Sequence, residues 1–359
     1  MSGGGTGGHI FPAVAVANFI KLSYADAEIL FVGAKHKMEM KKVPEAGYNI
    51  IGLNISGLQR RLTLENLLFP LKVISSYLAS LKIIRAFKPD VVVGFGGYAS
   101  SPITMAAASK RIPILLQEQN SFAGLANKTV ARRASVICVA YENMDKFFAA
   151  EKIVLTGNPV RDNILQSTIS KSEAVNEFGL DSNASTILIL GGSLGARTVN
   201  ESIIQNVDKL IEANINVVWQ TGSLYYEEMN ARMADRSATK IKLVEFITQM
   251  EQAYEAADLV ISRAGALTIS ELCIAGKPVV FVPSPNVAED HQTKNAMALV
   301  NQNAAEIISD KDAVEQLVDK ALAVLNSSDR LDTLTKNIKA LARPNATKDI
   351  TTKILSLIK

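Results

Sequence analysis

Three clusters of glycine in this sequence stand where they could hold phosphate groups. They are Gly3–Gly8, Gly94–Gly97 and Gly191–Gly195. Glycine lets the backbone turn sharply and approach a ligand closely, and a helix that follows such a turn offers N–H groups and a partial positive charge to an anion. An ordinary tight turn between a strand and a helix has the same pattern, so the clusters alone do not decide between the two interpretations.

The stretch from Ser262 to Asn295 has side chains that suit a nucleotide-sugar. Gly265 follows an apolar run and is expected to open a helix, whose N-terminus would be a second anion site. Glu271 would lie about two turns into that helix, where its carboxylate could accept hydrogen bonds from two ribose hydroxyls. Gln292 could both donate to and accept from sugar hydroxyls. Either residue alone is more typical of a solvated surface, and their joint spacing is what favours a binding site.

His9 is the leading candidate for a general base, because it follows the first glycine cluster at an expected helix start. There the helix dipole disfavours the charged imidazolium and keeps a neutral base available. A histidine that only positions the loop would look the same, and Glu118 is the second candidate. No Asp-x-Asp stands in a position to hold a metal, and His36 and His291 have no His or Cys partner at metal-ligand spacing. We therefore expect catalysis without a metal or other cofactor.

Short β-branched, apolar runs alternate with helical stretches along the chain. Such runs are typical of parallel strands covered on both faces. The alternation predicts an α/β fold with two Rossmann-like, doubly wound parallel-sheet domains. The expected strands are Ile29–Val32, Val91–Val93, Ile114–Leu116, Val136–Val139, Ile187–Leu190, Val217–Trp219, Leu259–Ile261 and Val279–Val282.

The length of 359 residues is too great for one ordinary core and suits two domains. Asn158-Pro159 indicates a hinge, because proline restricts the residue before it and breaks helices. We expect an N-terminal domain of residues 1–160 and a C-terminal domain of residues 161–359. The last helix, at residues 346–358, could pack on either domain.

The composition is that of a globular protein, with 48% hydrophobic and 20% charged residues. A net charge of only +3 argues against a dedicated nucleic-acid binder, which needs a stronger basic bias. Cys138 and Cys273 lie far apart in apolar stretches, which argues against a disulfide framework and fits a reducing cytoplasm. Neither a signal-peptide pattern nor a long uninterrupted apolar run is visible in the sequence.

The segment Leu58–Lys88 combines apolar residues at helical spacing with a basic fringe. Its basic residues are Arg60, Arg61, Lys72, Lys82, Arg85 and Lys88, against the single acid Glu65. An apolar helical face usually belongs to the core, but the cationic fringe favours an anionic lipid surface, at about 1 kcal/mol per well-placed basic residue. We expect a peripheral contact with an anionic membrane surface through this segment.

The motifs of this chain resemble those of the MurG family, which are UDP-sugar glycosyltransferases of the GT-B fold. The matching stretches run in the same order from residue 3 to about residue 296. They are Gly4–Ala13, Gly94–Ser100, Gln117–Asn120, Ala123–Asn127, Gly157–Arg161, Gly191–Arg197 and the stretch from Ser262 to Ala296.

The resemblance implies a GT-B architecture, in which two Rossmann-like domains face each other across a cleft that holds the active site. It implies transfer of N-acetylglucosamine from UDP-N-acetylglucosamine, with inversion at the anomeric carbon. The acceptor would be the muramyl sugar of a lipid-linked muramyl-peptide, so that lipid I becomes lipid II in peptidoglycan synthesis. Such an enzyme is peripheral, at the cytoplasmic face of the cell membrane.

The resemblance also implies roles for individual residues. The donor site would comprise Thr6, Gly7, Gly8, Asn120, Arg161, Ser193, Ile247, Ala266, Leu267, Thr268, Ile269, Ser270, Glu271 and Gln292. Among them, Ser193 would touch the donor diphosphate, Ile247 the uracil and Glu271 the ribose. The acceptor diphosphate would be received by Gly5, Gly96, Gly97 and Tyr98.

Other functions share this fold and stay open at the level of sequence. A transferase could act on another lipid acceptor. A UDP-sugar 2-epimerase would need neither the membrane segment nor the two N-terminal glycine clusters. A membrane-docked scaffold could bind a nucleotide-sugar without turnover. The sequence also leaves open the identity of the base, the peptide and lipid length of the acceptor, and the oligomeric state.

The start of the chain departs from the family pattern. A Rossmann-like domain normally places a strand directly before its first glycine loop, and here only Met1 and Ser2 precede Gly3. Without that strand its neighbours would leave backbone groups unpaired, each costing about 1–3 kcal/mol when buried. We therefore expect residues 1–3 to form no complete strand and the first sheet to show a gap or a closed-up neighbour. We also expect the natural chain to carry about 5–12 more residues with a short β-branched run.

Overall fold

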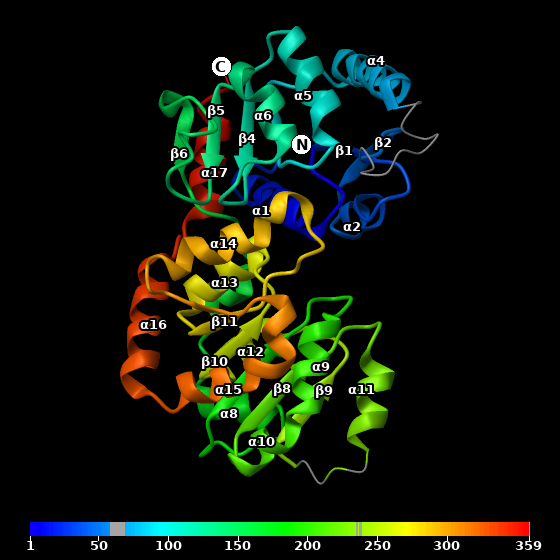
Figure 1. Ribbon diagram of the computed structural model, residues 1–359. Coiled ribbons are helices and arrows are strands. Elements are labelled where there is room, and N and C mark those ends of the chain that lie inside the picture. Colours follow the sequence, from blue (N-terminus) through cyan, green and yellow to red (C-terminus); the bar gives the residue numbers. More distant parts are fainter. Residues whose placement is uncertain (58–68, 235, 237–238, 359) are drawn as a thin grey trace. The chain divides into compact units, whose positions relative to one another are not determined.

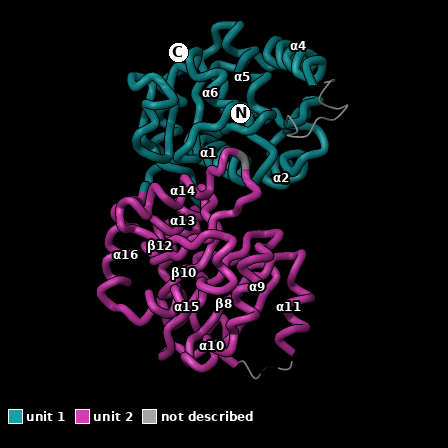
Figure 2. Tube along the Cα trace, in the orientation of Figure 1, with its two compact units in different colours: residues 1–160, 343–359 teal, residues 161–342 magenta. Residues whose placement is uncertain are grey.

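The computed structural model describes residues 1–57, 69–234, 236 and 239–358. The chain forms two compact α/β units (Figures 1 and 2). Unit 1 comprises Met1–Val160 and Arg343–Lys359, and unit 2 comprises Arg161–Ala342. The chain therefore leaves unit 1 after Val160 and returns to it at Arg343.

Unit 2 is built around a six-stranded parallel sheet in the order β12-β11-β10-β7-β8-β9. Counted along the chain from β7, this is the order of a doubly wound Rossmann sheet. The four central strands are buried along their whole length, which is why their sequences are continuous apolar runs. The strands are β7 Thr186–Leu190, β8 Asn216–Gln220, β9 Ile241–Val244, β10 Leu259–Ser262, β11 Val279–Phe281 and β12 Glu306–Ile307.

Helices cover this sheet, and α9 and α15 pack on each other. Ile187 of β7 and Trp219 of β8 join Val199 of α9 and Leu317 of α15 in one buried cluster. The helices of unit 2 are α7 Asp162–Gln166, α8 Lys171–Glu177, α9 Arg197–Gln205, α10 Val207–Glu212, α11 Tyr226–Met233, α12 Met250–Ala256, α13 Ala266–Ala275, α14 His291–Val300, α15 Ala313–Leu325 and α16 Ser328–Ala340, with short 3-10 turns η3 Ala288–Asp290 and η4 Asp310–Asp312.

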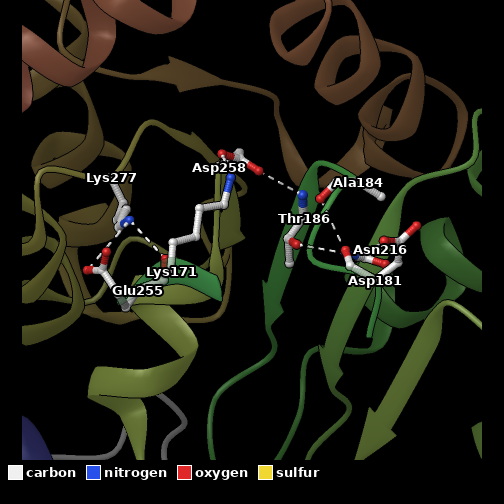
Figure 3. Close-up of polar contacts among 8 residues, drawn as sticks. All are labelled: Lys171, Asp181, Ala184, Thr186, Asn216, Glu255, Asp258 and Lys277. Carbon is white, nitrogen blue, oxygen red and sulfur yellow. Dashed lines mark hydrogen bonds and ion pairs between the residues drawn. The ribbon is translucent and has the colours of Figure 1, made fainter. Parts of the chain in front are cut away.

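Side chains tie together the amino ends of three strands of this sheet (Figure 3). Lys171 of α8 forms an ion pair with Asp258, which directly precedes β10. The other carboxylate oxygen of Asp258 accepts from the backbone N–H of Thr186, at the start of β7. The side-chain amide of Asn216, the first residue of β8, donates to the carbonyl oxygen of Asp181. These contacts fix where the three strands begin, and hence where the loops at their carboxyl ends lie.

Unit 1 has two parallel sheets, separated by the first residues of the chain. Ser2 forms single-residue parallel bridges to Val32 of β1 and to Gly94 of β3. As the sequence predicts, residues 1–3 form no complete strand and the sheet has a gap at that place. One sheet pairs β1 Leu30–Ala34 with β2 Asn49–Leu53, and the other contains β3 Val92–Gly94, β4 Ile114–Glu118, β5 Val136–Val139 and β6 Ile153–Leu155 in that order.

The helices of unit 1 pack as two pairs, α1 with α17 and α4 with α5. The last helix, which the sequence allows on either domain, thus belongs to unit 1 (Figure 1). None of the described helices is long and apolar enough to cross a membrane. The helices are α1 Gly7–Ser23, α2 Glu39–Glu45, α4 Phe69–Phe87, α5 Ser100–Ser109, α6 Leu125–Val130 and α17 Ala346–Leu355, with 3-10 turns η1 Ala131–Arg133 and η2 Ala150–Lys152.

Candidate functional site

The first glycine cluster turns the chain into α1, whose N-cap is Thr6. Glu39 is fully buried beside this turn. Its Oε2 accepts from the N–H of Gly5 at 3.1 Å, and its Oε1 accepts from the N–H of Ala34 at 3.0 Å. A Cβ at Gly4 would lie 2.2 Å from Oε1, so only glycine fits there. Glu39 therefore fixes the shape of the loop, although no motif in the sequence singles it out.

His9 lies in the first turn of α1, and the loop before it sets the orientation of its ring. Nδ1 lies 2.9 Å from the carbonyl oxygen of Gly4 and 3.3 Å from Oγ1 of Thr6. A carbonyl oxygen only accepts, so the contact with Gly4 places the proton on Nδ1. In the neutral ring the lone pair is then on Nε2, which is the tautomer that a general base acting through Nε2 requires.

The second glycine cluster packs directly on His9 and on the first cluster. Gly96 and Gly97 have φ of +85° and +76°, a left-handed conformation that glycine adopts without strain. A Cβ at Gly97 would lie 2.2 Å from the carbonyl oxygen of Gly4, and a Cβ at Gly96 would lie 3.1 Å from Cδ2 of His9. The structure thus brings the predicted base together with two of the predicted acceptor residues.

Tyr98 completes this group by lying against Gly5. A Cβ at Gly5 would be 3.3 Å from the ring of Tyr98, so the two residues are in close contact. Burial raises the pKa of Tyr98, and the carboxylate of Glu39 adds to the rise. The hydroxyl therefore keeps its proton and can donate a hydrogen bond. All four predicted acceptor residues accordingly gather beside His9 in unit 1.

Glu118 ends β4 and is buried, with 2% of its surface exposed. Its Oε1 accepts from the backbone N–H of Asn120, and its Oε2 accepts from the N–H of Gly124 at 3.0 Å and from Nδ2 of Asn127 at 2.9 Å. Burial raises the pKa of Glu118, and these hydrogen bonds oppose the rise. Both oxygens hold the loop that carries Asn120, an arrangement that suits a positioning role better than proton abstraction.

In unit 2, the cluster Gly191–Gly195 lies where the chain leaves β7 for β8. β7 lies between β8 and β10. The chain proceeds from β7 to β8 and β9 on one side, and from β10 to β11 and β12 on the other side. The order of the strands therefore reverses at β7, which makes this a topological switch point. Doubly wound sheets bind their ligands at such points. Ser193 is exposed in the loop, and its carbonyl oxygen accepts from the N–H of Ser223 at 3.1 Å. The hydroxyl of Ser193 is therefore accessible to a diphosphate.

Gln220, at the carboxyl end of β8, connects this loop to Ile247. Its Nε2 donates to the carbonyl oxygen of Gly192 at 3.1 Å, and its Oε1 accepts from the N–H of Ile247 at 2.9 Å. It thereby holds the predicted uracil contact close to the predicted diphosphate contact. No motif marks Gln220 in the sequence, although its place directly after the apolar run Val217–Trp219 is an available signal.

The predicted residues 266–270 form the start of α13. Gly265 is the N-cap, with φ −70° and ψ 140°, and it has no side chain with which to cap the helix. The first turn, with Ala266 and Thr268, presents backbone N–H groups to an anion. Ile269 is buried in the core, and Oγ of Ser270 donates to the carbonyl oxygen of Ala266 at 3.1 Å. Of these predicted residues, Ala266 and Thr268 lie in the first turn of the helix, whereas the side chain of Ile269 is part of the core and the hydroxyl of Ser270 is bonded to the helix backbone.

Glu271 is 7% exposed and is held by two side chains of unit 2. Arg161 donates from Nε to Oε1 at 2.9 Å and from Nη2 to Oε2 at 3.0 Å, and Tyr254 donates its hydroxyl to Oε2 at 2.9 Å. Burial raises the pKa of Glu271, and the charge of Arg161 lowers it. A carboxylate has about four acceptor positions, so this oriented group keeps capacity for a ribose hydroxyl. Tyr254 carries no signal in the sequence.

Gln292 lies in the first turn of α14, and its amide orientation is fixed by the backbone. Its Oε1 accepts from the N–H of Ser284 at 2.8 Å, so its NH₂ group is the part that can donate to a sugar hydroxyl. The two residues before α14, Glu289 and Asp290, have φ of +54° and +51°. Such left-handed conformations store strain and often occur where a loop shapes a ligand site.

An apolar stripe lies on the exposed face of α4. Leu71, Ile74 and Leu78 are 63%, 56% and 53% exposed, and Lys82 and Arg85 continue the same helical face. The opposite face packs into unit 1 through side chains that include Tyr77, Ile84 and Leu81. The rest of the predicted membrane segment, residues 58–68 with Arg60, Arg61 and Glu65, lies outside the described residues.

These arrangements are suited to binding phosphates and hydroxyl groups. Within the described ranges, no three His, Cys, Asp or Glu side chains gather where they could hold a metal ion. Unit 2 presents a helix N-terminus, an exposed glycine loop and an oriented carboxylate. Unit 1 presents an imidazole of defined tautomer among glycines.

Two family models match the chain. Residues 1–139 match the Glycosyltransferase family 28 N-terminal domain, and residues 186–350 match the Glycosyltransferase family 28 C-terminal domain. The chain belongs to glycosyltransferase family 28. The first family 28 match contains His9 and both N-terminal glycine clusters, and the second contains the glycine cluster Gly191–Gly195, Glu271 and Gln292.

Relatives in this family match over the whole length. A protein of Cytophaga hutchinsonii is 54% identical over 100% of this chain and 96% of its own length. A protein of Parabacteroides distasonis is 53% identical over 100% of this chain and 97% of its own length. Both are named UDP-N-acetylglucosamine--N-acetylmuramyl-(pentapeptide) pyrophosphoryl-undecaprenol N-acetylglucosamine transferase.

Solved structures agree with the family. The crystal structure of Acinetobacter baumannii MurG is similar with a TM-score of 0.82 and 33% identity, covering 99% of this chain and 98% of that chain. The resemblance to MurG and the two-domain GT-B fold are thereby confirmed. UDP-GlcNAc 2-epimerase from Neisseria meningitidis has a TM-score of 0.66 at 15% identity, covering 97% of each chain, and this likeness shows the fold alone.

Proposed function

We propose that this family 28 glycosyltransferase transfers N-acetylglucosamine from UDP-N-acetylglucosamine to the muramyl sugar of a lipid-linked peptidoglycan precursor. The reaction thereby converts lipid I to lipid II. The observation that carries the proposal is the 54% identity, over the full chain, to a protein with that named activity. The chain also has glycine loops on both units: Gly3–Gly8 and Gly94–Gly97 on unit 1 for the acceptor, and Gly191–Gly195 on unit 2 for the donor.

The donor binds to unit 2 in this proposal. Its diphosphate lies at Ser193 and the N-terminus of α13, where backbone N–H groups and the helix dipole stabilise negative charge. Ile247 contacts the uracil, and Glu271 accepts a hydrogen bond from a ribose hydroxyl. Arg161 and Tyr254 orient that carboxylate. Gln292 donates its amide N–H to a hydroxyl of the sugar, because its oxygen is already bound to Ser284.

The acceptor binds to unit 1, with its diphosphate among the two N-terminal glycine clusters and Tyr98. His9 removes the proton of the acceptor hydroxyl through Nε2 as that oxygen attacks the anomeric carbon. The bond from the anomeric carbon to the UDP oxygen breaks, and configuration at that carbon inverts. The helix N-terminus in unit 2 stabilises the charge that develops on departing UDP, so the proposed chemistry uses no metal.

The lipid part of the acceptor requires access to a membrane. We propose that α4 supplies it, because Leu71, Ile74 and Leu78 form an exposed apolar stripe that ends in Lys82 and Arg85. Apolar side chains can enter the interface while the basic ones contact anionic headgroups. The enzyme is accordingly peripheral, at the cytoplasmic face of the membrane where UDP-sugars occur.

The test is release of UDP by the purified enzyme with UDP-N-acetylglucosamine, in the presence and absence of a lipid-linked muramyl-peptide. We expect release only when the acceptor is present. Release without acceptor, together with a 2-epimerised sugar, would instead show an epimerase. Tight binding of the donor without any release would show a scaffold. Equal rates with a lipid-linked sugar that lacks the muramyl group would show a transferase for another lipid acceptor.

A further inference from the structure

A single peptide group connects His9 to a buried carboxylate. The carbonyl oxygen of Gly4 lies 2.9 Å from Nδ1 of His9, and the N–H of Gly5 donates to Oε2 of Glu39 at 3.1 Å. Both groups belong to one peptide unit, because the carbonyl carbon of Gly4 is bonded to the nitrogen of Gly5. This unit is trans, so its C=O and N–H point in opposite directions. His9 and Glu39 therefore bond to opposite ends of the same peptide dipole.

Two glycines make the space that Glu39 occupies. Helix α2 begins at Glu39, which is 0% exposed. A Cβ at Gly4 would lie 2.2 Å from Oε1 of this residue, and a Cβ at Gly33 of β1 would lie 2.6 Å from its Cγ. Neither glycine has a φ in the left-handed region, so backbone conformation does not require glycine at these positions. What requires it is room for the glutamate side chain.

The two donors that surround this side chain require a carboxylate. Oε1 of Glu39 accepts from the N–H of Ala34 at 3.0 Å, while Oε2 accepts from the N–H of Gly5. A carboxylate accepts at both oxygens, whereas an amide would place its NH₂ group against one of the two donors. Hydrogen bonds from backbone N–H groups also favour the ionised form of a carboxyl group. A negative charge is thus fixed on the side of the peptide unit opposite to His9.

The orientation of the Gly4–Gly5 peptide unit decides which nitrogen of His9 can act as a base. The unit rotates about bonds of two glycines, and Gly5 has a φ of +86°, so no Cβ opposes the rotation. A half-turn would exchange the C=O and the N–H, and an N–H group would then face Nδ1 of His9. Nδ1 would have to accept, and the proton of the neutral ring would move to Nε2. The ring would then have no lone pair on Nε2 with which to remove a proton.

We propose that Glu39 is a positioning residue that sets the tautomer of His9 through the Gly4–Gly5 peptide unit, a role that rests on the proposed function of His9 as the base. The carboxylate holds the N–H of Gly5, which directs the carbonyl of Gly4 to Nδ1 and keeps the lone pair on Nε2. The charge of Glu39 also polarises the peptide unit, because hydrogen bonds in a chain strengthen one another. The more negative carbonyl oxygen stabilises the imidazolium that forms when Nε2 takes the proton, as an orienting carboxylate does in a catalytic triad.

The tautomer can be measured by NMR without any turnover. The chain has three histidines, so in protein labelled with ¹⁵N at histidine the ring signals of His9 are those missing from His9→Ala. At a pH where the ring is neutral, we expect a protonated Nδ1 and an unprotonated Nε2 in the parent. In Glu39→Gln we expect the Nε2–H tautomer to appear. An Nε2–H tautomer in the parent would overturn the proposal, even if Glu39→Gln does not fold.

Val43→Ala is the matched control for loss of stability. Val43 lies in the same helix as Glu39 and is 1% exposed, so the substitution loosens the packing of α2 and leaves the carboxylate in place. We expect a lower Tm with the same His9 tautomer as in the parent. If Val43→Ala and Glu39→Gln change the tautomer equally, the cause is the packing of α2, and the carboxylate does not have the proposed role.

A double-mutant cycle tests whether Glu39 acts through His9. Glu39→Gln alone should lower kcat by about 10–100-fold, as loss of a residue that orients a reacting group does. In a His9→Ala background the same substitution should have little further effect, because the ring that it orients is absent. Losses that add in full would contradict the proposal. If the parent transfers no sugar while the tautomers change as expected, the proposed function fails and the link between Glu39 and His9 stands.

Discussion

His9 and Glu118 differ in what surrounds them, and the difference separates their proposed roles. The Nδ1 atom of His9 contacts the carbonyl oxygen of Gly4, which directs the lone pair to Nε2. We expect His9→Ala to lower kcat by about 10²–10⁴-fold, as removal of a general base does, with little change in Tm. Steady-state kinetics and a melting curve on the same preparation measure both quantities.

Glu118 should behave in the opposite way. Its oxygens accept from Gly124 and Asn127, so Glu118→Gln places an NH₂ group against donors and leaves buried groups unpaired, at about 1–3 kcal/mol each. We expect a lower Tm, with a loss of turnover that follows from the loosened loop. If Glu118→Gln melts like the parent and loses turnover as fully as His9→Ala, the base is Glu118 and the present assignment is wrong.

Glu271 should control donor affinity through its ionised form. Glu271→Ala should weaken UDP-sugar binding by about 1–3 kcal/mol, measured by calorimetry, because the ribose contact is lost. Tyr254→Phe is the matched control, since it removes one hydrogen bond and leaves the pair with Arg161 intact.

Burial raises the pKa of Glu271, so protonation should begin at a higher pH than for a solvated glutamate. Donor affinity should therefore begin to fall at a higher pH than a solvated glutamate would require as the pH is lowered, and Glu271→Gln should abolish that dependence. Unchanged affinity in Glu271→Ala would remove the ribose role.

The sequence could single out Glu271 and Gln292 because their types and spacing stand beside a recognisable glycine turn. It could not single out Glu39, Gln220 or Tyr254. Their functions depend on partners that are distant in sequence, such as Gly5 for Glu39 and Glu271 for Tyr254. A carboxylate that binds backbone N–H groups from two loops has no local pattern, so only the fold reveals it.

At the scale of elements, the two N-terminal glycine loops should act as one packed unit. Gly97→Ala should displace the first loop, because its Cβ would lie 2.2 Å from the carbonyl oxygen of Gly4. We expect a large rise in KM for the lipid acceptor, measured by steady-state kinetics. Gly47→Ala is the control, since Gly47 has a similar φ of +87° with nothing within 4 Å. Equal effects of the two substitutions would mean that backbone strain alone is responsible.

The stripe on α4 should bind anionic membranes through both its apolar and basic residues. Replacing Lys72, Lys82 and Arg85 with Glu should reduce co-sedimentation with vesicles that contain anionic lipid, by about 1 kcal/mol per residue at low salt. The control reverses the same number of charges elsewhere, at the exposed residues Lys311, Lys336 and Lys348. Equal sedimentation of parent and α4 variant would show that the stripe does not bind membranes.

The strands that the sequence missed share one property. The predicted strands are all present, within one or two residues at their ends, while β2, β6, β9 and β12 were not expected. Each of these four is the outermost strand of its sheet. None of them is fully buried, and β2 alternates between exposed and partly buried positions. An edge strand needs no continuous apolar run, so the pattern that identifies central strands does not identify β2, β9 and β12. β6 is a continuous apolar run, but it has only three residues.

At the scale of the molecule, both units place a glycine loop at the same kind of position among parallel strands. In unit 1 the loop follows Ser2, which lies between β1 and β3, and in unit 2 it follows Leu190 of β7, which lies between β8 and β10. From each of these positions the chain proceeds to the strand on one side first and reaches the strand on the other side later. This is why glycine clusters far apart in the sequence could be assigned to equivalent sites. The return of α17 to unit 1 could not be predicted, because an apolar helical face shows that a helix packs on a core but not on which core, and Ile350 and Ile354 meet partners that are distant in sequence.

The most direct test of the account is the structure of the product. The enzyme is incubated with UDP-N-acetylglucosamine and a lipid-linked muramyl-peptide in excess chelator, and the product is examined by mass spectrometry and NMR. We predict that the acceptor gains one N-acetylhexosamine on its muramyl sugar. The new bond should have β configuration, because a single displacement inverts the α-linked donor. An α-linked product, or turnover that stops with chelator and returns with magnesium, would contradict the proposed mechanism.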